Sequence, residues 1–398
     1  MTATCERRLP GVWTMLALAV AVVLSTGCGP TPFRPGPSLE VEEAGPADAA
    51  AVLFLVGDAG EARVEWTPLV HHLRAEVERW SAALPGDSSV ALVYLGDNVY
   101  PVGLHDAGHP EVPRDSARLM AQVFPVSGPE AATDATPAFF LPGNHDWGSQ
   151  GGPEGRARLA NQEAFLERVA AAGPSVALVP GSQAEAPTVV EMGAGGPRLV
   201  LLDTQWWLQS QDQGERQRLL DGLGRALDGA GDRPVVVAAH HPFRSGGPHA
   251  ERGLLDPLGL LARSGSVVQD LNAPPYEALL EGLEGVFTRA GEPLVYAAGH
   301  DHSLQVFQGE GAHEPRWSLV SGAASKTSSV TEMPGLMWAG RAPGYMRIVV
   351  RTNGRVELVV VRARDTYLSC ADRQGDARRG CLRDGAAAFA PAFSTRLR

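Results

Sequence analysis

Histidine, aspartate, asparagine and tyrosine recur just after short apolar segments of this 398-residue chain. The pattern occurs five times, at Gly57-Asp58-Ala59-Gly60, Gly96-Asp97-Asn98-Val99-Tyr100, Gly143-Asn144-His145-Asp146, Val237-Ala238-Ala239-His240-His241 and Gly299-His300-Asp301-His302. Imidazole is the commonest metal ligand, and oxygen donors bind the same ions. Each motif alone could be a plain turn, but five of them at five segment ends favour one shared metal site.

The apolar segments that precede these motifs have the length and composition of buried β-strands. They span residues 51–56, 90–95, 138–141, 235–239 and 293–298, with a further strand predicted at 199–202. Helical spacing of apolar residues predicts helices over 65–84, 115–124, 154–172, 215–227 and 278–289. This alternation predicts an α/β fold with largely parallel strands, in which ligands bind beyond the carboxyl ends of the strands. All five motifs lie at such ends.

The pattern changes after the fifth motif. Residues 317–320, 345–350 and 356–361 read as strands with no helices between them, and the turns that join them carry Gly or Asn. The alternation of strands and helices is therefore expected to stop after this motif.

The composition is that of a folded, acidic protein. Hydrophobic residues make up 44% and charged residues 20%, so a large core is expected. Lys+Arg is 34 and Asp+Glu is 45, which gives a net charge of -11. This acidity argues against nucleic acid as a partner. Nearly all positive charge is arginine, because Lys326 is the only lysine.

Residues 1–28 have the layout of a secretory signal, with a short basic segment followed by an apolar one. Small residues then lead to Cys28, which resembles the lipidated cysteine of a bacterial lipoprotein, although Ser25 replaces the usual leucine. We expect an exported protein, anchored by lipid in the periplasm or on the cell surface, with plain secretion as the alternative. Residues 29–50 are rich in Pro, Gly and Ala and read as a tether.

The remaining cysteines bear on the C-terminal end of the chain. Cys5 would leave with the signal, so Cys370 and Cys381 remain in a polar extension at 365–398 that follows a main domain at 51–364. Export favours a disulfide between them, with two free thiols as the alternative. A zinc site is disfavoured, because no further ligands lie nearby.

The donors of the five motifs are oxygen and nitrogen atoms, with no sulfur. This set suits iron, zinc or manganese. Seven ligands exceed the needs of one catalytic ion but suit two ions that share a carboxylate. Two ions a few ångströms apart can clamp the attacking and leaving oxygens of a displacement at phosphorus and can lower the pKa of a bound water.

The same motifs resemble those of the calcineurin-like metallophosphoesterases, and within them those of the purple acid phosphatases. Gly60 stands where the wider superfamily has a metal-binding histidine, and Tyr100 follows Asp97 by three residues as in the purple enzymes. The resemblance covers nearly all of residues 51–350. It is closest to the small, tartrate-resistant mammalian-type enzymes, because no separate β domain precedes the first motif. It implies a sandwich of two mixed β-sheets flanked by helices, in four layers.

Carried over residue by residue, the resemblance implies two metal sites. The first would hold Fe(III) through Asp58, Asp97, Tyr100 and His302. The second would hold Fe(II), Zn or Mn through Asp97, Asn144, His240 and His300, with His240 preferred to His241. His145 would contact the phosphate or protonate the leaving group, with Asp146 orienting it, and His249 is a second candidate for that role.

The activity implied is hydrolysis of small phosphate monoesters by attack of a metal-bound hydroxide. Two alternatives use the same motifs. The site could act on phosphodiesters or nucleotides, since loops set the substrate. Alternatively, the chain could be a lipid-anchored binding protein with an inactive site, although no expected ligand is missing from the sequence.

Overall fold

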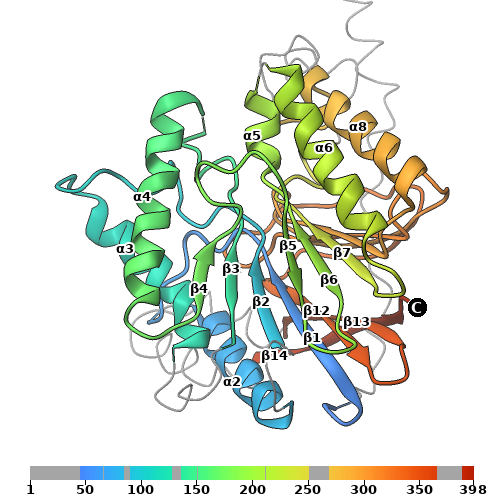
Figure 1. The fold of residues 1–398 in the computed structure, drawn as a ribbon. Coiled ribbons are helices and arrows are strands. Elements are labelled where there is room, and N and C mark those ends of the chain that lie inside the picture. The colour runs from blue at the N-terminus through green and yellow to red at the C-terminus, as the bar shows by residue number, and fades with distance from the viewer. Residues whose placement is uncertain are drawn as a thin grey trace, which may run out of the picture.

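The computed structural model describes residues 45–65, 67–84, 90–127, 136–149, 151–210, 212–250, 269–364 and 388–398. Two seven-stranded sheets pack against each other, with helices on their outer faces (Figure 1). Each sheet is mixed, with four adjacent parallel strands that form one half of the first sheet and the middle of the second, and antiparallel strands beside them. The predicted α/β sandwich of two mixed sheets flanked by helices is confirmed.

The first sheet has the strand order β14-β13-β12-β1-β2-β3-β4. Its parallel half begins with β1 and continues outward to β4. The strands are β1 (Ala49–Val56), β2 (Val90–Tyr94), β3 (Ala138–Phe140), β4 (Val176–Leu178), β12 (Gly344–Arg351), β13 (Val356–Ala363) and β14 (Phe389–Arg396).

The second sheet has the order β11-β9-β10-β8-β7-β6-β5. Its parallel strands are β6, β7, β8 and β10. The strands are β5 (Thr188–Glu191), β6 (Arg198–Leu201), β7 (Val235–Ala238), β8 (Val295–Ala298), β9 (Leu304–Gln308), β10 (Trp317–Ser321) and β11 (Leu336–Gly340).

Apart from α5, the α-helices of the described residues lie close to where the periodicity placed them. They are α2 (Pro68–Ala83), α3 (Val112–Val123), α4 (Gly152–Ala170), α5 (Thr204–Gln209), α6 (Gln213–Asp228) and α8 (Pro274–Ala290), with a short 3-10 turn at Phe124–Val126. Proline at the start of α2, α3 and α8 fits the first turn, where its missing N–H costs no hydrogen bond. None of the described helices is long and apolar enough to cross a membrane.

Alternation along β1 shows how the strands hold the layers together. Leu53 and Leu55 face the core between the two sheets, while Val52 and Phe54 face the outer core that α2 covers. Successive side chains of a strand point to opposite faces, so a strand covered on both sides must be apolar throughout. The unbroken apolar run of β1 is the sequence signature of this buried position.

The last strand extends the domain beyond its predicted end. β14 pairs with β13 along its length, so the boundary predicted at residue 364 excludes one strand of the first sheet. The periodicity also missed β4, β5, β9, β11 and the short helix α5, which are too brief or too polar to stand out. The predicted signal segment, residues 29–44 of the predicted tether and the Cys370–Cys381 disulfide lie outside the described residues.

Candidate metal centre

The five motifs meet where the carboxyl ends of the two sheets come together. Three follow β1, β2 and β3 of the first sheet, and two follow β7 and β8 of the second. Hydrogen bonds join the two sheets at this point. The N–H of Gly57 donates to the carbonyl of Ser321 at 2.7 Å, and the Nδ1–H of His240 donates to the carbonyl of Leu95 at 2.8 Å. The structure therefore brings together the five motifs that the sequence places at strand ends.

One group of donors gathers around Asp58. The Tyr100 hydroxyl donates to Asp58 Oδ1 at 2.9 Å and lies 3.2 Å from Nε2 of His302. That Nε2 is 3.5 Å from the same carboxylate oxygen. Donor atoms of Asp58, Asp97 and His302 all lie within 4.8 Å of one another. These are the four residues expected to hold the first metal.

A second group gathers around the side-chain oxygen of Asn144. This oxygen is 2.9 Å from Nε2 of His240 and 3.2 Å from Nδ1 of His300. His240 Nε2 is also 3.4 Å from Oδ1 of Asp97, which links the second group to the first. Asp97 thus touches both groups, as a bridging ligand must.

The hydrogen bonds of these two histidines leave one nitrogen of each ring available to a cation. His240 donates from Nδ1 to the Leu95 carbonyl, and His300 donates from Nε2 to the Gln269 carbonyl at 2.8 Å. Metal-binding histidines commonly hold their second nitrogen in this way. The free nitrogens then face the oxygen of Asn144, so three acceptors converge with no donor between them. A cation satisfies such a set, and the donors present fit two metal ions.

His241 is also close enough to be considered a ligand, since it clusters with His240 and His300. Its ring is already engaged, however. Nδ1 lies 2.8 Å from the Thr204 hydroxyl, and Nε2 lies 2.7 Å from Oε1 of Gln269. Burial lowers the pKa of His241 to about 3, so the ring is neutral at ordinary pH. These contacts support His240 as the ligand and assign His241 to packing beneath the centre.

Burial controls the charges of the centre. It raises the pKa of Asp58 well above its usual value, and the nearby Asp97 carboxylate raises it further. Burial also lowers the pKa of His300 well below its usual value and that of His302 to about 4. Two buried carboxylates that oppose each other's charge, beside neutral imidazoles, form a site that gains stability when cations bind.

The backbone is strained at three of the predicted ligands. Asp58, Asp97 and His300 have φ values of 60°, 56° and 69°, in the left-handed region that non-glycine residues seldom adopt. Such conformations persist where surrounding structure enforces them, and they concentrate at functional sites. Here they follow strand ends and turn each side chain back toward the shared centre.

His145 lies at the open side of the centre. Its Nδ1 is 2.5 Å from the carbonyl of Pro101 and 3.2 Å from the Ser149 hydroxyl, and its Nε2 is 3.9 Å from Oδ2 of Asp97. Its side chain is 29% exposed. The ring therefore presents Nε2 toward Asp97 and the candidate metal centre.

Asp146 has a different role from the one expected. Its carboxylate accepts hydrogen bonds from the N–H of Gly143 at 2.8 Å, from the backbone and side-chain amides of Asn98 at 3.0 Å each, and from the N–H of Val99 at 3.1 Å. These donors occupy both oxygens, so Asp146 joins the loops after β2 and β3. The groups that orient His145 are the Pro101 carbonyl and Ser149.

His249 reaches the centre from the loop after β7. Its ring centroid is 4.3 Å from that of His300, and its Nδ1 is buried without a hydrogen-bond partner among the described residues. Sequence reasoning missed Gln269, which contacts both His241 and His300. No sequence motif includes Gln269, because it reaches these histidines only through the tertiary fold.

A buried acid beneath the site gives a test of pH dependence. Asp203 caps α5 by accepting from the N–H of Trp206, and it also accepts from Nε1–H of Trp147, both at 2.9 Å. Burial nevertheless raises the pKa of Asp203 to about 6. The folded state therefore holds this proton more tightly than the unfolded state does. The resulting stability is present below about pH 4 and is lost as the pH rises through 6.

We expect Asp203→Asn to remove this pH dependence, because the amide is neutral throughout. The unfolding free energy of the unmodified chain should fall by up to about 3 kcal/mol relative to the variant between pH 4 and 7. Urea denaturation at several pH values, with chelator present, measures this difference. If the unfolding free energies of the two proteins changed in parallel with pH, Asp203 would have an ordinary pKa.

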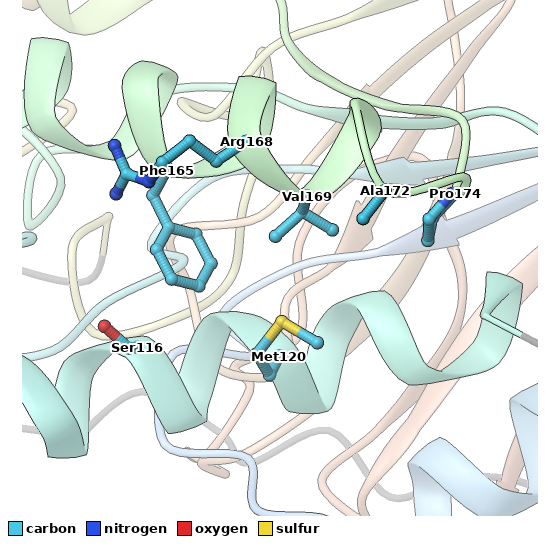
Figure 2. Close-up of a pocket in the computed structure, with 7 residues that line it drawn as sticks. All are labelled: Ser116, Met120, Phe165, Arg168, Val169, Ala172 and Pro174. Carbon is cyan, nitrogen blue, oxygen red and sulfur yellow. The ribbon is translucent and has the colours of Figure 1, made fainter.

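A cavity of about 490 Å³ lies elsewhere, between α3 and α4. Figure 2 shows Met120 and Ser116 on one side, and Phe165, Arg168 and Val169 on the other. None of its lining residues is an acid or a histidine, so this cavity lacks the groups needed for metal binding or acid–base chemistry.

Two solved structures share this architecture. GAP50, described as the anchor in the inner membrane complex of Plasmodium, is 14% identical with a TM-score of 0.51, and the match covers 79% of this chain and 85% of GAP50. The purple acid phosphatase PPD1 from yellow lupin (Lupinus luteus) seeds is 11% identical with a TM-score of 0.51. That match covers 80% of this chain but only 52% of the lupin enzyme. Identities this low show a common fold alone.

Sequence comparison gives the family. A search of curated proteins finds no match. Residues 55–304, however, match the family model of the calcineurin-like phosphoesterases. The matched segment contains all five strand-end motifs and spans more than half of the 398 residues, so this chain belongs to the calcineurin-like phosphoesterase family.

Proposed function

We propose that this protein is a metal-dependent phosphatase that hydrolyses small phosphate monoesters, similar to the small purple acid phosphatases. One observation carries the proposal. Seven donor side chains form two adjacent groups, and Asp97 contacts both of them. Asp58, Asp97, Tyr100 and His302 would hold Fe(III), and Asp97, Asn144, His240 and His300 would hold Fe(II), Zn or Mn.

The chain's own residues would bind and orient the ester at the mouth of the centre. When bound, the metals would supply Lewis acidity and lower the pKa of a water molecule. His145 presents Nε2 toward this position while the Pro101 carbonyl holds its other nitrogen. Protonated, the ring can hold a phosphate oxygen or pass a proton to the leaving oxygen. His249, whose Nδ1 has no partner among the described residues, is the second candidate for proton transfer.

A second function is favoured by the likeness to GAP50, since the match covers 85% of that anchor protein and only 52% of the lupin phosphatase. This chain could then be a membrane-anchored binding protein whose centre is catalytically inactive. The complete set of donors supports the phosphatase, because an inactive site has no need to retain every ligand.

Metal content together with hydrolysis separates these functions. The purified chain is analysed for metals and assayed with p-nitrophenyl phosphate and bis(p-nitrophenyl) phosphate. Two metals per chain and faster monoester hydrolysis are the expected result. Preferential diester hydrolysis would indicate a phosphodiesterase that uses the same site. Metal-bound protein without hydrolysis would favour the anchor, and failure to bind metal after reconstitution would overturn the phosphatase proposal.

Tyr100 provides a spectroscopic test of the Fe(III) assignment. A tyrosinate bound to Fe(III) absorbs visible light, so the loaded protein should be purple and Tyr100→Phe should lose the colour while keeping its fold. Among the described residues, the polar contacts of the hydroxyl lie within the centre, at 2.9 Å to Asp58 and 3.2 Å to His302. Visible absorption spectra of the two iron-loaded proteins provide the comparison. An unchanged band in the variant would remove Tyr100 from the ligand set.

We also propose that the protein is exported and anchored through a lipid on Cys28. The signal-like segment and the small residues before this cysteine support the proposal. Labelling cells with a fatty-acid analogue should tag the unmodified protein and leave Cys28→Ala untagged. Equal labelling of both proteins would contradict lipidation at this position.

A further inference from the structure

The mouth of the candidate metal centre contains a cation that the motifs do not include. Most of the predicted ligands are buried, whereas the side chains of His145, His302 and Lys326 are 29%, 27% and 31% exposed. Lys326 is also the only lysine in the chain. Its Nζ lies 3.4 Å from the centre of the Tyr100 ring. An anion that approaches the metals from solvent meets these three groups first.

The backbone around Lys326 is tied to the metal-binding loops. The Ser325 hydroxyl donates to the carbonyl of Asp58, and the N–H of Ser328 donates to the carbonyl of His302 at 2.6 Å. The N–H of Ala324, which directly precedes Ser325, donates to the carbonyl of Gly57 at 3.2 Å. The backbone that carries Lys326 is therefore tied to the loops of two predicted ligands, Asp58 and His302.

The present partner of Lys326 is one that an anionic ligand can replace. Its ammonium lies 3.3 Å from Oε1 of Glu61, and the Glu61 side chain is 44% exposed. Exposed ion pairs of this kind contribute little free energy, because water screens them. Beneath the ammonium lies the Tyr100 ring, whose face attracts cations without neutralising them. The positive charge remains available at the entrance.

We propose that Lys326 binds a non-bridging phosphate oxygen of the substrate and gives the site a preference for phosphate monoesters over diesters. This inference rests on the proposed function. A monoester phosphate carries close to two negative charges at neutral pH, because its second pKa is about 6. A diester carries one. A fixed cation beside the metals favours the doubly charged group, and an ammonium donates to phosphate oxygens without geometric restriction.

The kinetic test compares Lys326→Gln with Lys326→Arg, using p-nitrophenyl phosphate and bis(p-nitrophenyl) phosphate. We expect the glutamine variant to raise KM for the monoester about tenfold, the size of one charge-assisted hydrogen bond. KM for the diester should change less than about threefold, and arginine should restore most of the difference. Equal changes for both substrates, or none, would overturn the inference.

Glu61→Gln is the matched control, because it removes the same ion pair and leaves the lysine in place. We expect its KM for the monoester to stay unchanged or to fall, since Glu61 no longer competes for the ammonium. If Glu61→Gln raised KM as much as Lys326→Gln, the ion pair itself would be the important feature and the inference would fail.

Chemical labelling tests phosphate binding without measuring hydrolysis. A single lysine makes its reaction with an acylating reagent easy to follow by peptide mass mapping. Inorganic phosphate should slow the labelling of Lys326 in the metal-loaded protein, and sulfate at equal ionic strength should slow it less. Protection in a protein without hydrolysis would overturn the phosphatase and support the binding role of Lys326. Hydrolysis without protection would overturn the binding role alone.

Discussion

Asp97→Ala should release both metals and abolish hydrolysis, because Asp97 contacts both groups of donors. Its Oδ1 lies 3.4 Å from His240 Nε2, and its carboxylate clusters with the Asp58 carboxylate and the His302 ring. Replacing a group that only orients a metal ligand lowers metal affinity by roughly 10- to 100-fold. Loss of a bridging ligand should lower the metal affinity by more than a hundredfold. Metal analysis and p-nitrophenyl phosphate hydrolysis measure the effect.

The same substitution should leave the metal-free fold nearly intact. Burial raises the pKa of Asp97, but the His240 and His145 rings together with hydrogen bonds from the His145 N–H and the Tyr100 hydroxyl lower it below its usual value, so the carboxylate is ionised. Removing this buried charge also removes the cost of keeping it away from water, which offsets the hydrogen bond lost from the His145 N–H. Thermal denaturation in chelator should therefore show similar midpoints for the variant and the unmodified chain.

Asp115→Asn is the control for Asp97, since Asp115 is an equally buried acid outside the centre. It lies 2.7 Å from Nδ1 of His105 and 3.0 Å from Arg114. This variant should be somewhat less stable and keep both metals. If Asp97→Ala retained two metals per chain, the bridging assignment would be wrong.

Gly143→Ala should disrupt the centre through shape alone. A methyl group on Gly143 would collide with the backbone nitrogen and Oδ1 of Asp97, and it would lie 3.0 Å from the His240 ring. The backbone cannot easily move, because the N–H of Gly143 is bonded to Asp146 at 2.8 Å. Overpacking of this kind costs roughly 1–3 kcal/mol. We expect this loss of stability together with weaker metal binding.

Urea denaturation and metal analysis of Gly143→Ala measure the two effects separately. Gly45→Ala is the matched control, because a methyl group there has no heavy atom within 4 Å. The control should keep both its stability and its metals. Normal metal affinity in Gly143→Ala would show that the loop can accommodate the methyl group despite these close contacts.

The sequence by itself determined the types of residue at the centre and the elements that carry them. Buried strands such as β1 must be apolar on both faces, so their runs stand out, and polar residues directly after them mark the ends. This local rule is enough to place Asp58, Asp97, Asn144 and His300 at strand ends. Short edge strands such as β5 carry too few buried residues to be recognised in this way.

Only the tertiary structure decided how these residues divide their tasks. His240 and His241 are neighbours in sequence, and it is Thr204 and Gln269, distant along the chain, that engage both nitrogens of His241. Distant segments likewise decide the partners of Asp146 and Lys326. The Asp146 carboxylate accepts hydrogen bonds from the loop after β2, and Lys326 lies over Tyr100. Spacing along a chain specifies which side of a strand or helix a residue occupies. The partners of its polar atoms depend on which distant segments pack against it, and those contacts form only when the two sheets come together.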